Sequence, residues 1–147
     1  KLSASCVVIC EDKVLLVKHT YGAAAGKYLI PGGFSEDGEM PQVTAEREVL
    51  EETGVTVKVN DLIAVRFTCQ EVWTIFTAAY VKGEPISDHC ENEEALFMPI
   101  DELLVSENVV DTTKELVKSV LDVKKPVLKI SDFVNSRFDI STWQLYI

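Results

Sequence analysis

The stretch from Gly33 to Val55 reads GFSEDGEMPQVTAEREVLEETGV, and its second half decides the fold because its secondary structure is unambiguous. Pro41 suits the first turn of a helix, and the residues that follow it are rich in good helix formers. Gly54 stands where a residue in the left-handed conformation would end that helix. The pattern therefore predicts a helix from Pro41 to Thr53, capped by Gly54.

This helix carries an unusual crowd of carboxylates. At 100° per residue, Glu48, Glu51 and Glu52 fall in one arc about 100° wide. Like charges three or four residues apart destabilise a helix by a few tenths of a kcal/mol per pair. Most acidic runs are solvated faces, but here Arg47 is the only nearby cation. We expect the apolar side chains opposite and beside the arc to face the core: Val43, Leu50, Ala45 and Val49.

A divalent cation would turn this repulsion into affinity. Magnesium is typically held by a few carboxylates together with substrate phosphates. The turn at Gly32 and Gly33 enters just ahead of the helix and offers a backbone carbonyl as a further ligand. The arrangement predicts a magnesium or manganese site that would also neutralise an anionic substrate.

The composition excludes several classes of function. The chain has 147 residues, 47% of them hydrophobic, which indicates one domain with a sizeable core. Its 24 acidic residues exceed its 14 basic residues, so we expect no binding to duplex nucleic acid. No apolar run approaches the roughly 18 residues of a membrane span, and the first residues do not resemble a signal peptide.

The cysteine pattern favours a reducing compartment. Cys6 and Cys10 would lie roughly 13 Å apart along one strand, too far for one disulfide or one zinc ion. With Cys69 and Cys90 they are expected to be free thiols, which fits a cytoplasmic protein.

The rest of the chain reads mainly as strands. Glu11 and Asp12 form the turn of a predicted hairpin, and a brief strand ends at Pro31. The loop TYGAAAGK lacks the spacing of a Walker loop. Strands are predicted at residues 3–10, 13–18, 55–59, 61–69, 72–82 and 95–100, and a longer helix at 111–124. The tail carries aromatic residues that we expect to pack against the core: Phe133, Phe138, Trp143 and Tyr146.

The stretch from Gly33 to Val55 resembles the Nudix box. That motif is a glycine, five residues, Glu, seven residues, and then Arg-Glu-apolar-any-Glu-Glu-any-Gly-apolar. Every fixed position is met, at Gly33, Glu39, Arg47, Glu48, Val49, Glu51, Glu52, Gly54 and Val55. The resemblance implies an α+β Nudix fold, in which a mixed β-sheet is sandwiched between α-helices. We expect this domain to span residues 1–125 and the tail, 126–147, to pack on it.

The resemblance also implies an activity. Nudix hydrolases use magnesium or manganese to break a pyrophosphate bond in a nucleoside diphosphate linked to another moiety. By position, Glu48, Glu51 and Glu52 resemble the metal ligands or water-holding carboxylates, and the Gly33 carbonyl resembles a further ligand. Glu39 and Arg47 resemble the pair that braces the loop against the helix, a role that suits the rigid fork of an arginine.

The general base and the substrate contacts are less constrained. Some family members use a Glu of the box as the base, and others use one in a loop before the last strand. The segment CENEEALF offers Glu91, Glu93 and Glu94 for that role, and His19 is a further alternative. Lys18 and Arg66 are candidates for phosphate contacts, and Tyr28 and Trp73 for stacking on a base or for core packing.

The identity of the substrate is encoded outside the box. The extended NADH-hydrolase signature is absent, and Gln70 stands where ADP-ribose hydrolases tend to have a proline. The sequence is therefore interpreted as a MutT-like nucleotide pyrophosphohydrolase with a small-molecule nucleotide as partner. The alternatives are a non-catalytic nucleotide-binding or regulatory module and, less well matched in length, an isopentenyl diphosphate isomerase. A homodimer is a further expectation.

Overall fold

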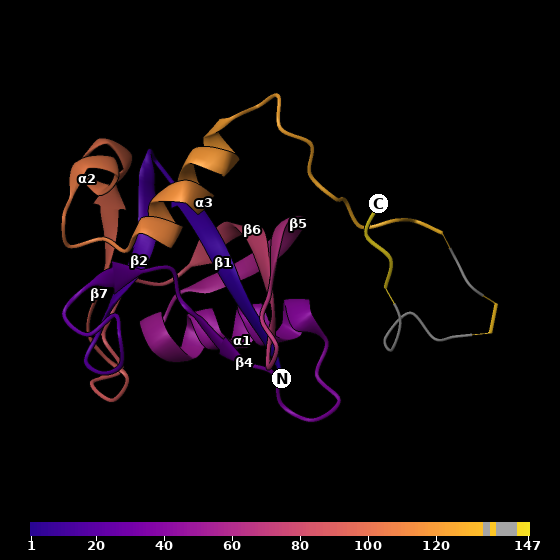
Figure 1. Cartoon of the computed structure of the whole chain (residues 1–147), viewed down its shortest axis with the longest axis horizontal. Helices are drawn as coiled ribbons and strands as arrows, with labels where there is room; N and C mark the ends of the chain where they lie inside the picture. Colours follow the sequence, from indigo (N-terminus) through magenta and orange to yellow (C-terminus); the bar gives the residue numbers. More distant parts are fainter. Residues whose placement is uncertain (134–135, 138–143) are drawn as a thin grey trace.

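A mixed β-sheet forms the centre of the molecule. The computed structural model describes residues 1–133, 136–137 and 144–147 (Figure 1). Its strands are β1 (Leu2–Cys10), β2 (Lys13–His19), β3 (Tyr28–Leu29), β4 (Gly32–Phe34), β5 (Thr56–Phe67), β6 (Val72–Lys82) and β7 (Asn92–Pro99). Its helices are α1 (Pro41–Thr53), α2 (Ile100–Val105) and α3 (Asp111–Leu121).

Strand β1 organises the sheet. The strand order is β3-β2-β1-β6-β5, with β4 paired to β1 and β7 paired to β2. β1 runs parallel to β6 and antiparallel to β2 and β4. The hairpin turn between β1 and β2 falls at Glu11 and Asp12, both with positive φ, as a tight hairpin turn requires. The mixed sheet confirms the predicted α+β class.

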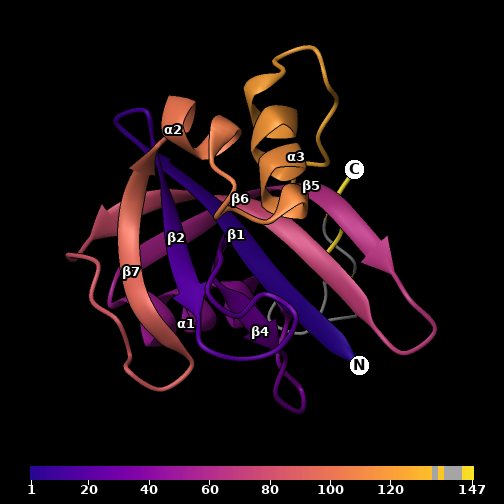
Figure 2. The same cartoon turned by 60° about the vertical axis from the view of Figure 1, so that its left-hand side comes forward.

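Helices cover both faces of the sheet. Figure 2 shows α1 below the sheet and α2 and α3 above it. Because side chains alternate along a strand, Ala4, Cys6 and Val8 of β1 pack with α1, while Val7 packs with α3. The two hydrophobic cores therefore lie on opposite sides of β1.

Helix α1 has the predicted bounds but a different buried face. It ends at Gly54, whose φ is 71°, as expected for a left-handed cap. Val43 and Leu50 are half exposed, however, so the prediction that they face the core is wrong. The buried residues are Thr44, Ala45, Val49, Glu52 and Thr53. The sheet covers a side of the helix that includes part of the carboxylate arc, and Glu52 is therefore buried.

Three other elements differ from the sequence-based expectation. β5 is one strand, where two were predicted, because irregularities between Val59, Leu62 and Ala64 interrupt its register without ending it. β7 begins at Asn92, before the predicted start, and α3 ends at Leu121 because Asp122 is extended.

The described parts of the tail contact strands β5 and β6 of the sheet. Leu128 and Leu62 exchange both backbone hydrogen bonds, at 2.9 and 3.0 Å. The ring of Tyr146 lies 5.7 Å from that of Phe76 and packs against the core on the α1 side. Phe138 and Trp143 lie outside the described residues. The proposed boundary between domain and tail stays a prediction.

Two further expectations concern cysteines and membranes. Cys6, Cys10, Cys69 and Cys90 are all free thiols. In the part of the chain that the structure describes, no helix has the length and apolar character needed to cross a membrane.

Candidate active site

Arg47 is the centre of a hydrogen-bond network beneath the acidic edge of α1. Its guanidinium binds the Glu39 carboxylate through Nε to Oε1 and Nη2 to Oε2, both at 2.9 Å. Nη2 also donates to the Phe34 carbonyl at 3.0 Å. Nη1 donates to Glu48 Oε1 at 2.8 Å and to Glu51 Oε2 at 3.0 Å. One side chain thus ties the loop before the helix to two of its carboxylates.

The electrostatics of Glu39 reflect this contact. The hydrogen bonds from Arg47 lower the pKa of the Glu39 carboxyl to about 2, and bonds from the Glu36 amide and the Thr44 hydroxyl act in the same direction. In turn, the carboxylates raise the pKa of Arg47 above its usual value. Glu39 is therefore ionised at any pH at which the protein would work.

Glu48 occupies space that only a glycine at position 33 leaves free. A Cβ built on Gly33 would meet the Glu48 carboxyl carbon at 2.5 Å, well inside contact distance. The Gly33 backbone pairs with Ala4 of β1 and cannot easily retreat. Burial raises the pKa of Glu48, opposed by the hydrogen bond from Arg47. The glycine thus lets a desolvated carboxylate approach the backbone of the turn.

Glu52 is the most buried carboxylate of the box, with 2% of its surface exposed. Its Oε2 accepts a hydrogen bond from the Gly32 amide at 2.8 Å. Its Oε1 has no hydrogen-bond partner among the described residues and lies 3.9 Å from His19 Nε2. Burial raises the pKa of Glu52, opposed by His19 and by the hydrogen bond from the Gly32 amide, and the charge of Glu91 adds to the rise. A buried carboxylate oxygen without a hydrogen bond lowers the stability of the folded protein, and native proteins contain few such atoms.

The carboxylates are near one another without forming a finished cation site. Among the described residues, no three His, Cys, Asp or Glu side chains are already gathered in a metal-binding cluster. Glu48 and Glu51 both point an oxygen at Arg47, and the Glu51 side chain is 58% exposed. The exposed Glu51 side chain therefore has room to rotate away from Arg47.

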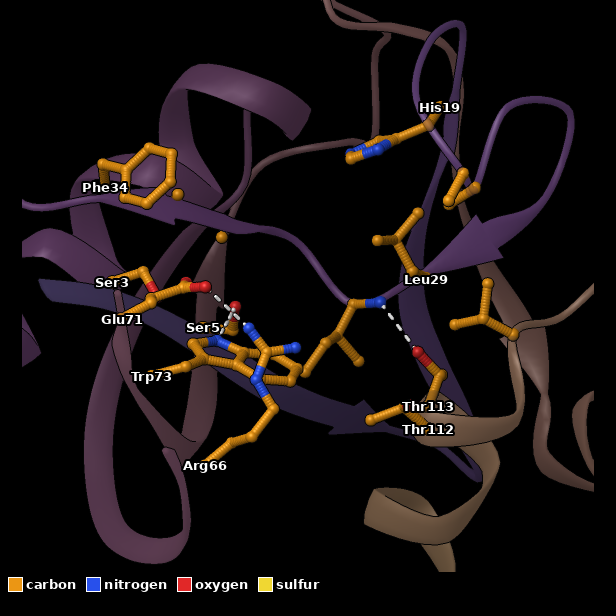
Figure 3. Close-up of a pocket in the computed structure, with 16 residues that line it drawn as sticks. Ser3, Ser5, His19, Leu29, Phe34, Arg66, Glu71, Trp73, Thr112 and Thr113 are labelled. Atoms are coloured by element: carbon orange, nitrogen blue, oxygen red, sulfur yellow. Dashed lines mark hydrogen bonds and ion pairs between the residues drawn. The ribbon is translucent and has the colours of Figure 1, made fainter. Parts of the chain in front are cut away.

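A pocket of about 510 Å³ opens beside the turn that precedes α1. Gly32, Gly33 and His19 line it near the box, and Arg66 and Trp73 lie in its opposite wall (Figure 3). Its remaining lining is mostly apolar and small: Ala23, Ala24, Leu29, Ile30, Phe34, Val110, Thr112 and Thr113, with Ser3, Ser5 and Glu71 as polar members. Its size and lining are typical of small-molecule sites.

The wall opposite His19 is a fixed polar network. The guanidinium carbon of Arg66 lies 4.6 Å from the ring centroid of Trp73. Arg66 Nη2 donates to Glu71 Oε2 at 2.8 Å, and the Ser3 hydroxyl donates to Glu71 Oε1. Trp73 Nε1 donates to the Ser5 hydroxyl at 2.9 Å. These contacts hold an arginine flat on an aromatic ring.

Three other residues that the sequence predicts as site residues, Lys18, Tyr28 and Glu94, do not line this pocket. Tyr28 donates its hydroxyl to Glu94 Oε2 at 2.5 Å, and this contact helps to raise the pKa of Tyr28 to about 12, after burial. Lys18 pairs with Glu93 at 3.0 Å. Tyr28 and Glu94 line a different depression, near α2. Of the sequence-predicted residues, Gly33, Arg66, Trp73 and His19 come together in the main pocket, and Lys18, Tyr28 and Glu94 do not.

Two of the residues predicted as candidate bases, His19 and Glu91, lie near Glu52 of the box. His19 stacks on Tyr21, with ring centroids 5.3 Å apart. Glu91, in the loop before β7, contributes to the raised pKa values of both Tyr21 and Glu52. Asn92 is fully buried and donates to the Glu52 carbonyl at 2.9 Å. The start of β7 is therefore anchored to the end of α1.

Sequence reasoning missed several pocket residues. Ser3 and Ser5 alternate with apolar residues along β1 and so share a face, a signal that could have been read from the strand period. Glu71 and Thr113 gave no such signal. Their placement depends on the β5–β6 turn and on the packing of α3, where Thr113 accepts a hydrogen bond from the Ile30 amide.

The sequence matches the family described as NUDIX domain over residues 1–120. It is 32% identical over 110 residues to the NAD-capped RNA hydrolase NudC of Escherichia coli O1:K1. That match covers 68% of this chain and 40% of NudC, so the chain spans less than half the length of this relative.

Solved structures show the same architecture. A NUDIX hydrolase from Nitrosomonas europaea superposes with a TM-score of 0.72 at 26% identity, covering 80% of this chain and 68% of the other. The MutT NUDIX hydrolase from Burkholderia pseudomallei gives a TM-score of 0.71 at 20% identity, covering 82% and 97%. At the latter identity the likeness concerns the fold alone.

Proposed function

The chain belongs to the NUDIX family, and from this premise we propose that it is a magnesium- or manganese-dependent hydrolase of a nucleoside diphosphate linked to another moiety. The bond broken would be the pyrophosphate bond. One observation carries the proposal: two carboxylates of the box, Glu48 and Glu52, are desolvated beside the glycine turn that lines the pocket instead of lying on a solvated face. Glu52, buried with an unpartnered oxygen, is the clearest case.

The donor set fits a hard divalent cation. Glu48, Glu51, Glu52 and the Gly33 carbonyl are oxygen ligands of the type that magnesium and manganese prefer. Oε1 of Glu52, which has no hydrogen-bond partner among the described residues, would gain a partner when a cation binds, and the pKa of Glu48 is raised because burial outweighs its hydrogen bond from Arg47. When bound, the ion supplies positive charge against the substrate phosphates and polarises the bond to be broken.

Arg47 and Glu39 are proposed to position the ligands. By holding Glu39 with two hydrogen bonds and the Phe34 carbonyl with a third, Arg47 fixes the turn that contains Gly33 relative to α1. Its contacts with Glu48 and Glu51 reduce the repulsion between them until a cation arrives.

Glu91 is the candidate base that the geometry favours. It lies in the loop before β7, and its charge acts on Glu52 and Tyr21. Glu94, another of the alternatives from the sequence, is held by the Tyr28 hydroxyl in another depression. A base must reach the attacking water near the phosphate, so we propose Glu91 for this role and keep Glu94 as the comparison.

The pocket gives room for the nucleoside. Its volume of about 510 Å³ lies within the range of small-molecule sites, and its lining is largely apolar with a few polar groups at one end. The curated relative is named for an NAD cap, and NAD contains a pyrophosphate bond between two nucleotides. We propose a small nucleotide as partner and, from the four free cysteines, a cytoplasmic setting.

The direct test is product release from a nucleotide panel with and without magnesium. The panel contains nucleoside triphosphates, nucleotide sugars, ADP-ribose, NAD and dinucleoside polyphosphates, and products are separated by chromatography. We expect hydrolysis of at least one class, which chelator abolishes without unfolding the protein. The melting temperature should rise with millimolar magnesium, because an ion that binds the folded state stabilises it.

The same measurements distinguish the alternative. Nucleotide binding without hydrolysis of any compound in magnesium or manganese would identify a non-catalytic binding module. A melting temperature that neither ion changes, with or without nucleotide, would contradict the metal site itself.

A further inference from the structure

The arginine in the far wall of the pocket has unused hydrogen-bond donors. Arg66 gives one N–H to Glu71, which is its only hydrogen-bond partner among residues 1–133, 136–137 and 144–147. Figure 3 shows its other terminal nitrogen directed away from Glu71, toward the middle of the pocket. A guanidinium has five N–H donors in one plane. The Arg66 fork is therefore available to a ligand.

The orientation of this fork is fixed in advance. The guanidinium lies on Trp73, 4.6 Å from the ring centroid, and the indole is itself held by its bond to Ser5. Glu71 is fixed at both oxygens, by Arg66 and by Ser3. A preformed donor plane of this kind favours a planar ligand group that accepts two hydrogen bonds in that plane.

The charge at this end of the pocket disfavours a phosphate. The positive charge of Arg66 is balanced by Glu71 at 2.8 Å, and among the described residues no lysine or second arginine lines the pocket. A phosphate bound to Arg66 would lie close to the Glu71 carboxylate, and like charges repel. A neutral ring with acceptor atoms has no such penalty.

Among purine bases, the acceptor pattern selects one class. Guanine and hypoxanthine present O6 and N7 as adjacent acceptors, and an arginine binds that edge with two hydrogen bonds. Adenine presents a donor, its N6 amino group, beside N7, so it would place donor against donor. Phe34 also lines the pocket, on the side of Ser3 and Glu71 (Figure 3).

We infer that Arg66, held by Trp73 and Glu71, selects a nucleotide with a 6-oxopurine base. The inference rests on the proposed function for the position of the phosphates, which would lie toward Gly33 and the carboxylates of α1. It assigns Arg66 to base recognition instead of the phosphate contact expected from the sequence, and it names Glu71 as the residue that positions it.

The test compares four triphosphates that differ only in the base: GTP, ITP, 7-deaza-GTP and ATP. In the wild-type protein with magnesium we expect kcat/KM for GTP and ITP to exceed that for ATP about 10-fold or more, the scale of one bidentate contact. 7-Deaza-GTP, which lacks N7, should fall between them. The preference should appear mainly in KM.

Two variants separate recognition from folding. Arg66→Lys keeps the charge but removes the planar fork, and should reduce the GTP-to-ATP ratio in kcat/KM below about 3-fold, mainly by raising KM for GTP. Glu71→Gln should also reduce the ratio, because Arg66 loses its ion-pair partner. Lys118→Ala, on the exposed face of α3, is the control and should leave the ratio unchanged.

The outcomes distinguish this inference from the proposed function. If no nucleotide is hydrolysed, calorimetry with the α,β-methylene analogues of GTP and ATP measures base preference alone. Tighter binding of the guanine analogue, lost in Arg66→Lys, would support the inference even though the proposed function had failed. Equal kcat/KM for the four substrates, equal binding of the two analogues, or a preference that Arg66→Lys leaves intact would overturn it.

Discussion

Glu52 Oε2 accepts a hydrogen bond from the backbone amide of Gly32 at 2.8 Å, and this contact joins the end of helix α1 to the turn that lines the pocket. The other oxygen of the same carboxylate is buried without a hydrogen-bond partner among the described residues and lies 3.9 Å from His19 Nε2. The protein therefore keeps a carboxyl group in a place where its ionised form costs stability, as sites of binding and catalysis often do.

Replacing Glu52 with Gln should separate activity from stability. Turnover should fall about 100-fold or more, because a negative charge is lost where a cation is expected to bind. Since burial raises the folded-state pKa of Glu52, the wild-type protein loses stability as pH rises through that pKa. The variant lacks this loss, so its metal-free urea midpoint at pH 8 should be equal or higher. Near-normal turnover would contradict the proposed role, and Glu115→Gln on α3 is the matched control.

Replacing Gly33 with Ala should displace Glu48. The added Cβ would meet the Glu48 carboxyl at 2.5 Å, so we expect about a 100-fold loss of turnover and a stability loss of about 1–3 kcal/mol. A double-mutant cycle measures the cause: in the Glu48→Ala background, the stability cost of Gly33→Ala should largely disappear. An equal cost in both backgrounds would assign the effect to the backbone instead of to Glu48.

Replacing Arg47 with Ala should reduce stability and activity together. The change leaves Glu39, Glu48 and Glu51 without their shared partner, and we expect a loss of about 2–4 kcal/mol in the free energy of unfolding. Lys58→Ala removes an exposed ion pair with Glu46 and should cost about 1 kcal/mol or less. Similar unfolding midpoints for the two variants would show that Arg47 does not brace the site.

The Glu39 carboxyl should produce a measurable acid dependence. Its folded-state pKa of about 2 lies below the ordinary value of 4.5, so its contribution is fully present above pH 4.5 and is lost as pH falls toward 2. The contribution is at most about 3 kcal/mol, from the size of the shift. In denaturant titrations, the stability difference between wild type and Glu39→Gln should shrink across this window. A difference that stays constant from pH 6 to pH 3 would argue against the ion pair.

Of the two candidate bases, Glu91 in the loop before β7 should matter more for turnover than Glu94 in β7 itself. Glu91→Gln is expected to lower kcat about 100-fold or more if this carboxylate is the base, with metal-induced stabilisation retained. Glu94→Gln leaves a group that can still bond to Tyr28 and should keep turnover within about 3-fold. A larger loss of turnover in Glu94→Gln than in Glu91→Gln would instead identify Glu94, in β7, as the base.

The box could be predicted from sequence because its signals are local. The helix bounds and the Gly54 cap follow from residue types within one segment, and the register of the box places Glu39 opposite Arg47. The buried face of α1 could not be predicted, because a helical wheel gives angles between side chains but not which side the sheet covers. Val43 and Leu50 are therefore exposed, while Glu52 is buried.

The residues that line the pocket outside the box could not be predicted from the sequence for a related reason. Arg66, Glu71 and Trp73 are brought to Ser3 and Ser5 by the parallel pairing of β1 with β6, a contact between residues about 70 positions apart. No local pattern specifies which strands become neighbours. The sequence therefore indicates Arg66 as a candidate site residue but does not predict its contacts with Glu71 and Trp73.

The bridge between Leu62 and Leu128 bears on how two copies of this chain could meet. β5 is the last strand in the order of the sheet, and open strand edges are where sheets of separate molecules join. At Leu62 the hydrogen-bonding groups of that edge are already taken by the chain's own C-terminal segment. A homodimer built by extending the sheet across this part of β5 would have to displace that segment first, so self-association there would compete with an intramolecular contact and would become easier on proteolytic loss of the C-terminus.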